Sequence, residues 1–122
     1  MPISWRIVDG VVFLESIDSA IFEEWHAAVE GFLAHPDYQP GMGVVHDWRG
    51  LGEAPLPSDI RTRAEYLERH ASSLARTRWA LVVTGGVSYG MGRMAEGLVD
   101  GSSVELRAFR DLAEAEAWVR GG

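Results

Sequence analysis

Residues 79–84 read WALVVT, and two glycines, Gly85 and Gly86, follow them. A strand with one side in solvent alternates apolar and polar residues, whereas this stretch is apolar at almost every position. Such a strand is typical of the centre of a parallel sheet that is covered by helices on both faces. A second short apolar stretch, residues 43–48 (GVVHDW), lies upstream. Together the two stretches predict the middle of an α/β fold.

The spacing of apolar residues predicts the elements around this centre. Residues 3–8 and 11–14 flank Asp9-Gly10, the strongest short signal of a β-hairpin, and residues 104–109 alternate as a last strand. Apolar residues at helical spacing predict four helices, over residues 21–33, 57–74, 89–98 and 112–119. The order is therefore ββαβαβαβα. We predict one domain over residues 1–122, with a five-stranded, mixed but mostly parallel sheet that begins with the N-terminal hairpin.

The composition excludes several classes of function. The chain of 122 residues has a net charge of −7 and no cysteine, and all 11 of its basic residues are arginine. We therefore expect no thiolate metal site, no Schiff-base lysine and no nucleic-acid partner, since an acidic chain repels the phosphate backbone. We also expect no cofactor. No apolar run approaches the ~20 residues of a transmembrane segment, and the start lacks the basic region of a signal peptide, so a cytoplasmic protein is expected.

Several short motifs resemble those of a known family. The string Tyr89-Gly90-Met91-Gly92-Arg93-Met94 follows the central strand, Phe109-Arg110-Asp111 comes later with Ala115 and Trp118, and Asp47 and Arg49 form an Asp-x-Arg pair. In these features the chain resembles the SpoIIAA-like proteins, which are small bacterial relatives of STAS domains and, in fold, of CRAL-TRIO lipid-binding domains. The resemblance implies the same fold. It also implies either a regulatory role or an apolar, lipid-like ligand.

Two places along the predicted sheet edge are candidate binding sites. Asp47 and Arg49 follow a predicted parallel strand, where open α/β sheets bind ligands; they form either the polar rim of a crevice or a local cap and ion pair. The glycine-rich turn that ends at Arg93 offers free N–H groups to an anion, unless Arg93 pairs instead with a carboxylate such as Asp47 or Glu96. Trp48 and Tyr89 are the candidate apolar contacts, under a flap over residues 49–57.

Catalysis is not predicted. His46 and Asp47 are adjacent in a strand and so point to opposite faces, which favours a structural histidine. The histidines have no metal-ligand spacing, so no metal site is expected. Our leading hypothesis is a non-enzymatic binding module for a small apolar or amphipathic ligand, with transient membrane association. The alternative is a regulatory protein-interaction module of the anti-sigma-antagonist type, modified at Ser58 or Ser88, although the family's usual serine position just after the strand is here Trp48. A homodimer fits either hypothesis.

Overall fold

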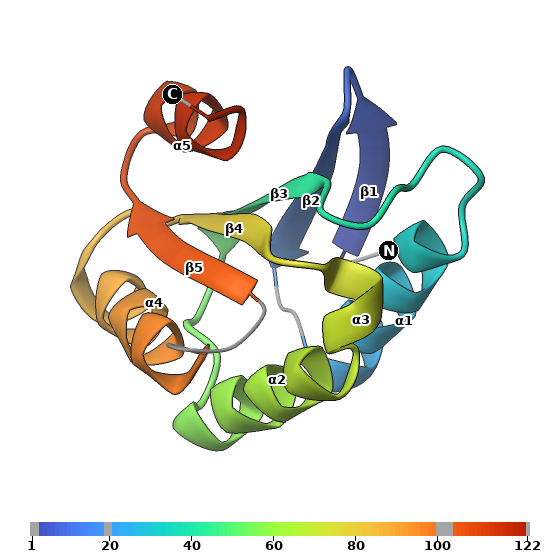
Figure 1. The fold of residues 1–122 in the computed structure, drawn as a ribbon. Coiled ribbons are helices and arrows are strands. Elements are labelled where there is room, and N and C mark those ends of the chain that lie inside the picture. The colour runs from blue at the N-terminus through green and yellow to red at the C-terminus, as the bar shows by residue number, and fades with distance from the viewer. Residues whose placement is uncertain (1–2, 19–20, 100–103, 122) are drawn as a thin grey trace.

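The computed structural model describes residues 3–18, 21–99 and 104–121 and shows one five-stranded sheet with helices on both faces (Figure 1). The strands are β1 (Ile3–Val8), β2 (Val11–Asp18), β3 (Gly43–Leu51), β4 (Thr77–Val82) and β5 (Val104–Phe109). The helices are α1 (Phe22–Leu33), α2 (Pro57–Arg69), α3 (Ala71–Leu74), α4 (Gly86–Val99) and α5 (Leu112–Val119). The predicted α/β class and strand order are confirmed.

The strands lie side by side in chain order, β1 to β5. The β1–β2 pair is antiparallel and the other three pairs are parallel. Asp9 and Gly10 connect β1 to β2, and both have positive φ angles, 51° and 79°. A two-residue hairpin turn of the favoured type requires this conformation at both central positions. The Asp-Gly signal therefore predicted the turn correctly.

Two layers of core separate the sheet from its helices. The larger cluster lies against α1, α2 and α4 and contains the bulky side chains Trp25, Phe32, Trp48, Trp79 and Leu81. The smaller cluster lies under α5, which stands alone on its side of the sheet (Figure 1). The hydrophobic core is therefore larger on the face that α1, α2 and α4 cover than on the face under α5. Among the described residues, no helix is long and apolar enough to cross a membrane.

The structure corrects the predicted helix over residues 57–74. It ends at Arg69, and after His70, whose φ of −108° and ψ of 27° are not helical, the single turn α3 follows. The chain then passes through two residues of positive φ, Ala75 and Arg76, before β4 begins. The described residues thus form five helices where four were predicted, because apolar spacing continues across the break.

The predicted flap is also shorter than expected. Strand β3 continues beyond Trp48 to Leu51, because Gly50 and Leu51 pair with Ile17 and Asp18 of β2. The N–H of Gly52 then donates to the Asp18 carbonyl at 2.7 Å. Arg49 to Leu51 are therefore strand residues, and the connection to α2 is limited to residues 52–56.

Strand β5 forms one edge of the sheet, and a side chain covers part of that edge. The N–H of Ala108 donates to Oε2 of Glu96, from α4, at 2.7 Å. The other carboxylate oxygen of Glu96 lies 3.2 Å from Nε of Arg93. Glu96 thus supplies a hydrogen-bond acceptor to one backbone N–H of the edge strand.

Candidate functional site

A cavity lies between the sheet and helices α2 and α4. The cavity is small: the space inside it that water can occupy is about 30 Å³, room for about two water molecules. Three indoles, one imidazole and one guanidinium line it together with aliphatic side chains of α2, α4, β4 and β5: Trp25, His46, Trp48, Trp79, Arg63, Ile60, Ala64, Leu67, Leu81, Ala95, Val99 and Leu106. A mostly apolar hollow with a few polar groups is typical of a small-molecule site.

His46 brings an imidazole to this cavity from the middle of β3. The ring is fully buried, and its Nε2 lies 2.7 Å from the Oγ of Ser16, itself fully buried on the neighbouring strand β2. Burial and then the charge of Arg63 lower the pKa of His46 to about 3, although Asp47 opposes this. The ring is therefore neutral at physiological pH. Its Nδ1 is buried and has no hydrogen-bond partner among the described residues.

Trp48 lies two residues further along β3, on the same face of the strand as His46. Its side chain is 3% exposed, and the two rings meet edge to face with centroids 6.0 Å apart. The indole Nε1–H is buried and donates to no acceptor within the described part of the chain. An unsatisfied buried N–H costs about 1–3 kcal/mol. Two residues that line the cavity, His46 and Trp48, thus each have a buried ring nitrogen without a partner among the described residues.

An irregularity in the sheet lies at this point. Glu15 pairs with Asp47, but Ile17 pairs with Gly50, so that two residues of β3, Trp48 and Arg49, oppose Ser16 alone. This is a β-bulge, a feature that is enriched next to active and binding sites. It brings Ser16, His46 and Trp48 together at one place in the sheet.

Arg63 closes the cavity from α2. Its side chain is buried, its guanidinium lies 5.5 Å from the centre of the Trp25 ring, and it binds the Asp59 carboxylate through Nη2 at 3.1 Å and Nε at 3.3 Å. Burial works to lower the pKa of Arg63, and Asp59 opposes this. No Asp or Glu is among the described residues that line the cavity. The Asp59 carboxylate compensates the charge that Arg63 brings to the cavity wall.

Asp47 and Arg49, two of the predicted site residues, lie on the opposite face of the sheet. They border a shallow groove with Arg6, Phe13 and Leu112. The Oδ1 of Asp47 accepts from the backbone N–H and the Nε of Arg49 at 2.9 and 3.0 Å, and Oδ2 accepts from Nη2 at 2.9 Å. Burial works to raise the pKa of Asp47, but these bonds and the charge of Arg49 outweigh it and hold the pKa below its usual value. The two side chains thus form a hydrogen-bonded ion pair with each other.

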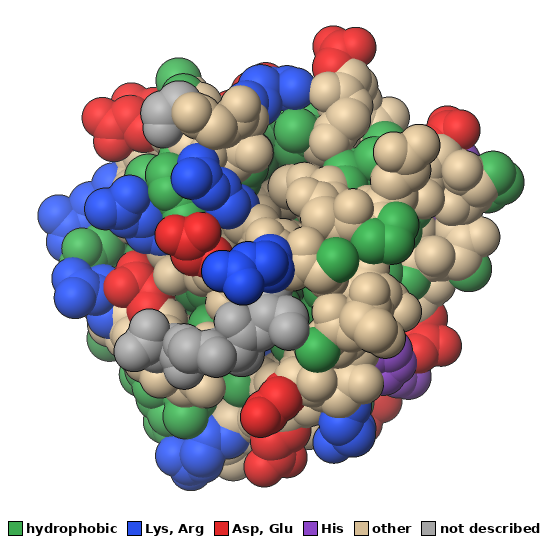
Figure 2. Space-filling model, viewed as in Figure 1, with side chains coloured by type: hydrophobic (Ala, Val, Ile, Leu, Met, Phe, Trp, Pro, Cys, Tyr) green, Lys and Arg blue, Asp and Glu red, His purple; other side chains and the backbone are tan. Residues whose placement is uncertain are grey.

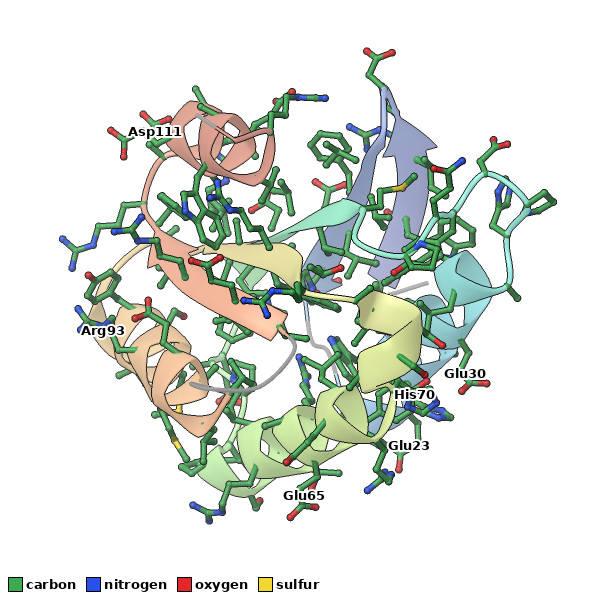
Figure 3. All side chains as sticks on the ribbon, in the orientation of Figure 1. Glu23, Glu30, Glu65, His70, Arg93 and Asp111 are labelled. Carbon is green, nitrogen blue, oxygen red and sulfur yellow. The ribbon has the colours of Figure 1, made fainter. Side chains whose placement is uncertain are left out.

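Tyr89 and Arg93 belong to α4 and also lie away from the cavity. Arg93 is 62% exposed on the outer side of the helix (Figure 3), where it pairs with Glu96, and the ring of Tyr89 lies under the guanidinium of Arg110 at 4.3 Å. A hydrogen bond with Tyr89 and the charge of Glu96 raise the pKa of Arg93. Figure 2 shows basic and acidic side chains similarly interleaved over this face of the molecule. Of the five predicted ligand-binding residues, only Trp48 reaches the cavity.

The two candidate phosphorylation sites lie in first turns of helices. Ser58 is exposed in the first turn of α2, beside a shallow groove that Ile21, Phe22 and Leu56 border. Ser88 lies in the first turn of α4 and is partly buried. Within the described ranges, no three His, Asp or Glu side chains are grouped so that they could hold a metal ion.

Ser16 and Arg63 are the residues that sequence reasoning missed. Both carry a recognisable signal. Ser16 continues the inward-facing positions of Val12 and Leu14 along β2, and Arg63 lies between Ile60 and Leu67 on the apolar stripe of α2. A polar residue at an inward position needs a partner or a ligand.

Known proteins resemble this chain in fold rather than in sequence. No protein-family model and no curated protein matches it. The chain is similar to the crystal structure of an uncharacterised protein of the DUF3478 family, described as having a SpoIIAA-like fold, from Shewanella loihica PV-4. The TM-score is 0.63 at 16% sequence identity, over 96% of this chain and 91% of the other. The expected SpoIIAA-like fold is therefore confirmed.

Proposed function

We propose that the protein is a non-enzymatic binding module, and that its ligand is a small amphipathic molecule held between the sheet and helices α2 and α4. The observation that carries this proposal is that His46 and Trp48, which line a mostly apolar cavity, each have a buried ring nitrogen, Nδ1 and Nε1, without a partner among the described residues. A polar group of a ligand would remove the energetic cost of both. The three indole rings and the aliphatic side chains would contact its apolar part.

The cavity as it stands has room for about two water molecules, about 30 Å³, which is far below the roughly 300–1,000 Å³ of usual ligand sites. A ligand would therefore have to open the cavity by moving α2 or α4 away from the sheet. Ser16 and His46 do not form a reactive pair at the cavity, because Ser16 is fully buried and is not among the described residues that line it.

Mass spectrometry of the purified protein, first under native and then under denaturing conditions, tests this proposal. We expect a small molecule to be retained under native conditions and released on denaturation. The variant Ala64→Leu would fill the cavity from α2 and abolish retention. Ala27→Leu, which adds the same volume at an exposed site on α1, is the matched control and should retain the molecule.

A protein that carries no ligand after purification is tested by adding small amphiphiles and observing the indole N–H signal of Trp48 by NMR. The signal is assigned by its loss in Trp48→Phe. If no amphiphile shifts this signal at millimolar concentration, the proposal is wrong.

A second function has one observation in its favour, namely the exposed apolar surface beside Ser58. Ile21 is 55% exposed and Leu56 is 69% exposed, and both border the groove next to this serine. A phosphate on Ser58 would be stabilised by the N-terminus of α2 and would add charge beside the apolar surface. The regulatory module predicts a phosphate on the Ser58 peptide of protein isolated from its own cells. An unmodified peptide throughout growth would contradict it.

A further inference from the structure

The groove on the α5 side of the sheet is roomier than the cavity on the other side. Water can occupy about 200 Å³ of it, against about 30 Å³ of the cavity. This volume approaches the low end of usual ligand sites, about 300 Å³. The groove lies over β1, β2 and β3 beside the first turn of α5, and eight residues border it: Arg6, Phe13, Leu14, Glu15, Val45, Asp47, Arg49 and Leu112. A molecule of a few heavy atoms therefore has room there while the helices stay in place.

The groove has an apolar floor. Val45 is 1% exposed and belongs to the core cluster under α5, and Phe13 and Leu112 are partly buried against that cluster. Alternate residues of a strand share a face, so Glu15 lies on the side of β2 that carries Phe13, and Asp47 on the side of β3 that carries Val45. Charged side chains thus stand beside apolar ones.

Arg6 and Glu15 bring charges of opposite sign to the rim of the groove. The guanidinium of Arg6 lies 5.2 Å from the centre of the Phe13 ring, a cation–π contact that keeps it over the floor. Both side chains are exposed, and neither forms an ion pair with any residue that the structure describes. One positive and one negative group are therefore available to a ligand.

The remaining charges on the rim are those of Asp47 and Arg49, which bind each other. The hydrogen bond and the charge of Asp47 raise the pKa of Arg49, burial opposes this, and the charges of Glu15 and Asp111 add to it. Glu15 is therefore close enough for its charge to act on Arg49. Because Asp47 and Arg49 compensate each other, the rim as a whole favours neither an anion nor a cation.

We infer that the groove binds a free α-amino acid with a small aliphatic side chain, whose carboxylate accepts from Arg6 and whose ammonium group donates to Glu15. A simple acid would be attracted to Arg6 but repelled by Glu15, and an amine would meet the reverse. A zwitterion matches both signs at once, and both of its hydrogen bonds are charge-assisted. Its aliphatic side chain would lie on the apolar floor. This site is on the opposite face of the sheet from the cavity of the proposed function and does not depend on it.

Three probes that share one aliphatic body test the inference. They are L-valine, isovalerate, which lacks the amino group, and isobutylamine, which lacks the carboxylate. Each is titrated at pH 7 into protein labelled with ¹³C in its methyl groups, and the signals of Val45 and Leu112 report on the groove. We expect L-valine to bind at least about fivefold more tightly than either of the others, because each of them lacks one charge-assisted hydrogen bond.

Two variants that each remove one charge of the groove should change this preference in different ways. Arg6→Gln should lower the affinity for L-valine to that for isobutylamine, and Glu15→Gln should lower it to that for isovalerate. Arg61→Gln and Glu65→Gln remove the same charges at exposed positions of α2. These matched controls should change the affinity by less than about twofold.

Three results would overturn the inference. The first is equal affinity for the three probes, and the second is an equal effect of the groove variants and their controls. The third is the absence of any shift at Val45 and Leu112 with L-valine at millimolar concentration. None of them bears on the ligand of the cavity, which the Trp48 signal follows separately.

Discussion

The Oγ of Ser16 and the Nε2 of His46 lie 2.7 Å apart on neighbouring strands, and both side chains are fully buried. This bond joins β2 to β3 where the bulge interrupts their regular pairing. It is therefore both a structural contact across the irregular part of the sheet and the device that orients the imidazole toward the cavity.

Removing this hydroxyl should destabilise the fold measurably. Ser16→Ala leaves the buried Nε2 of His46 without a partner, which costs about 1–3 kcal/mol. The free energy of unfolding in urea measures the loss. Ser4→Ala, at an exposed position of β1, is the control and should change stability by less than about 0.5 kcal/mol. Equal stability of the two variants would mean that the bond contributes nothing.

The stability of the protein should fall as the pH drops below the usual pKa of histidine. The pKa of His46 is about 3 in the folded chain and 6.5, the usual value of histidine, in the unfolded chain, so between these values the unfolded chain binds a proton and the folded chain does not. The stabilisation is complete above pH 6.5 and is lost as the pH falls toward 3. Between pH 7 and pH 5 we expect a loss of about 2 kcal/mol from this residue.

Urea denaturation at pH 7, 6 and 5 measures this dependence, and His46→Gln is the comparison. The variant should lose the slope that His46 contributes, whatever its stability at pH 7. Asp47 contributes little to this slope, because its usual pKa of 3.8 and its lower pKa in the folded chain both lie below pH 5. A variant with the same slope as the wild type would contradict the neutral, buried state of His46.

The ion pair between Asp47 and Arg49 should affect the pKa of Asp47 more than the stability of the fold. Arg49 is 44% exposed, and exposed ion pairs contribute about 0–1 kcal/mol. We expect Arg49→Ala to lower stability by less than about 1 kcal/mol and to raise the pKa of Asp47 toward its usual value. Carboxyl-detected NMR titration measures the pKa. Arg61→Ala, which removes an exposed arginine of α2, should leave the pKa of Asp47 unchanged.

Replacing glycines of α4 by alanine should lower the stability of the protein at one position and raise it at two others. A Cβ on Gly92 would meet the Cβ of Ala108 at 2.9 Å, whereas a Cβ on Gly90 or Gly97 has no atom within 4 Å. We expect Gly92→Ala to destabilise the protein by about 1–3 kcal/mol, because α4 must move away from β5. Gly90→Ala and Gly97→Ala should stabilise it by about 0.5–1 kcal/mol, because alanine is the better helix former. A gain in Tm for Gly92→Ala would show that α4 is not held tightly against the sheet.

The sequence carried enough information for the fold because its signals were local. Continuous apolar stretches mark the two inner parallel strands, and Asp9-Gly10 marks the hairpin. The break at His70 was missed because an apolar face that continues through a break has the same spacing as one helix. Only backbone geometry distinguishes the two.

The site could be predicted only in part, since it depends on pairing between distant segments. Trp48 was expected to line the mouth of a site under a flap, but β3 continues past it, and the side chain is buried instead. At the bulge, Trp48 and Arg49 of β3 lie opposite Ser16 of β2. The sequence of either strand alone does not show this. Alternation did place Asp47 and His46 on opposite faces, as the structure has them.

The carboxylate of Glu96 has a consequence for how this sheet meets other chains. An uncovered edge strand is a template on which a second chain can add a strand and extend the sheet. Here any strand that approaches β5 at Ala108 must first displace an acidic side chain that Arg93 holds in place. The two residues therefore hinder the addition of a strand at this position of β5.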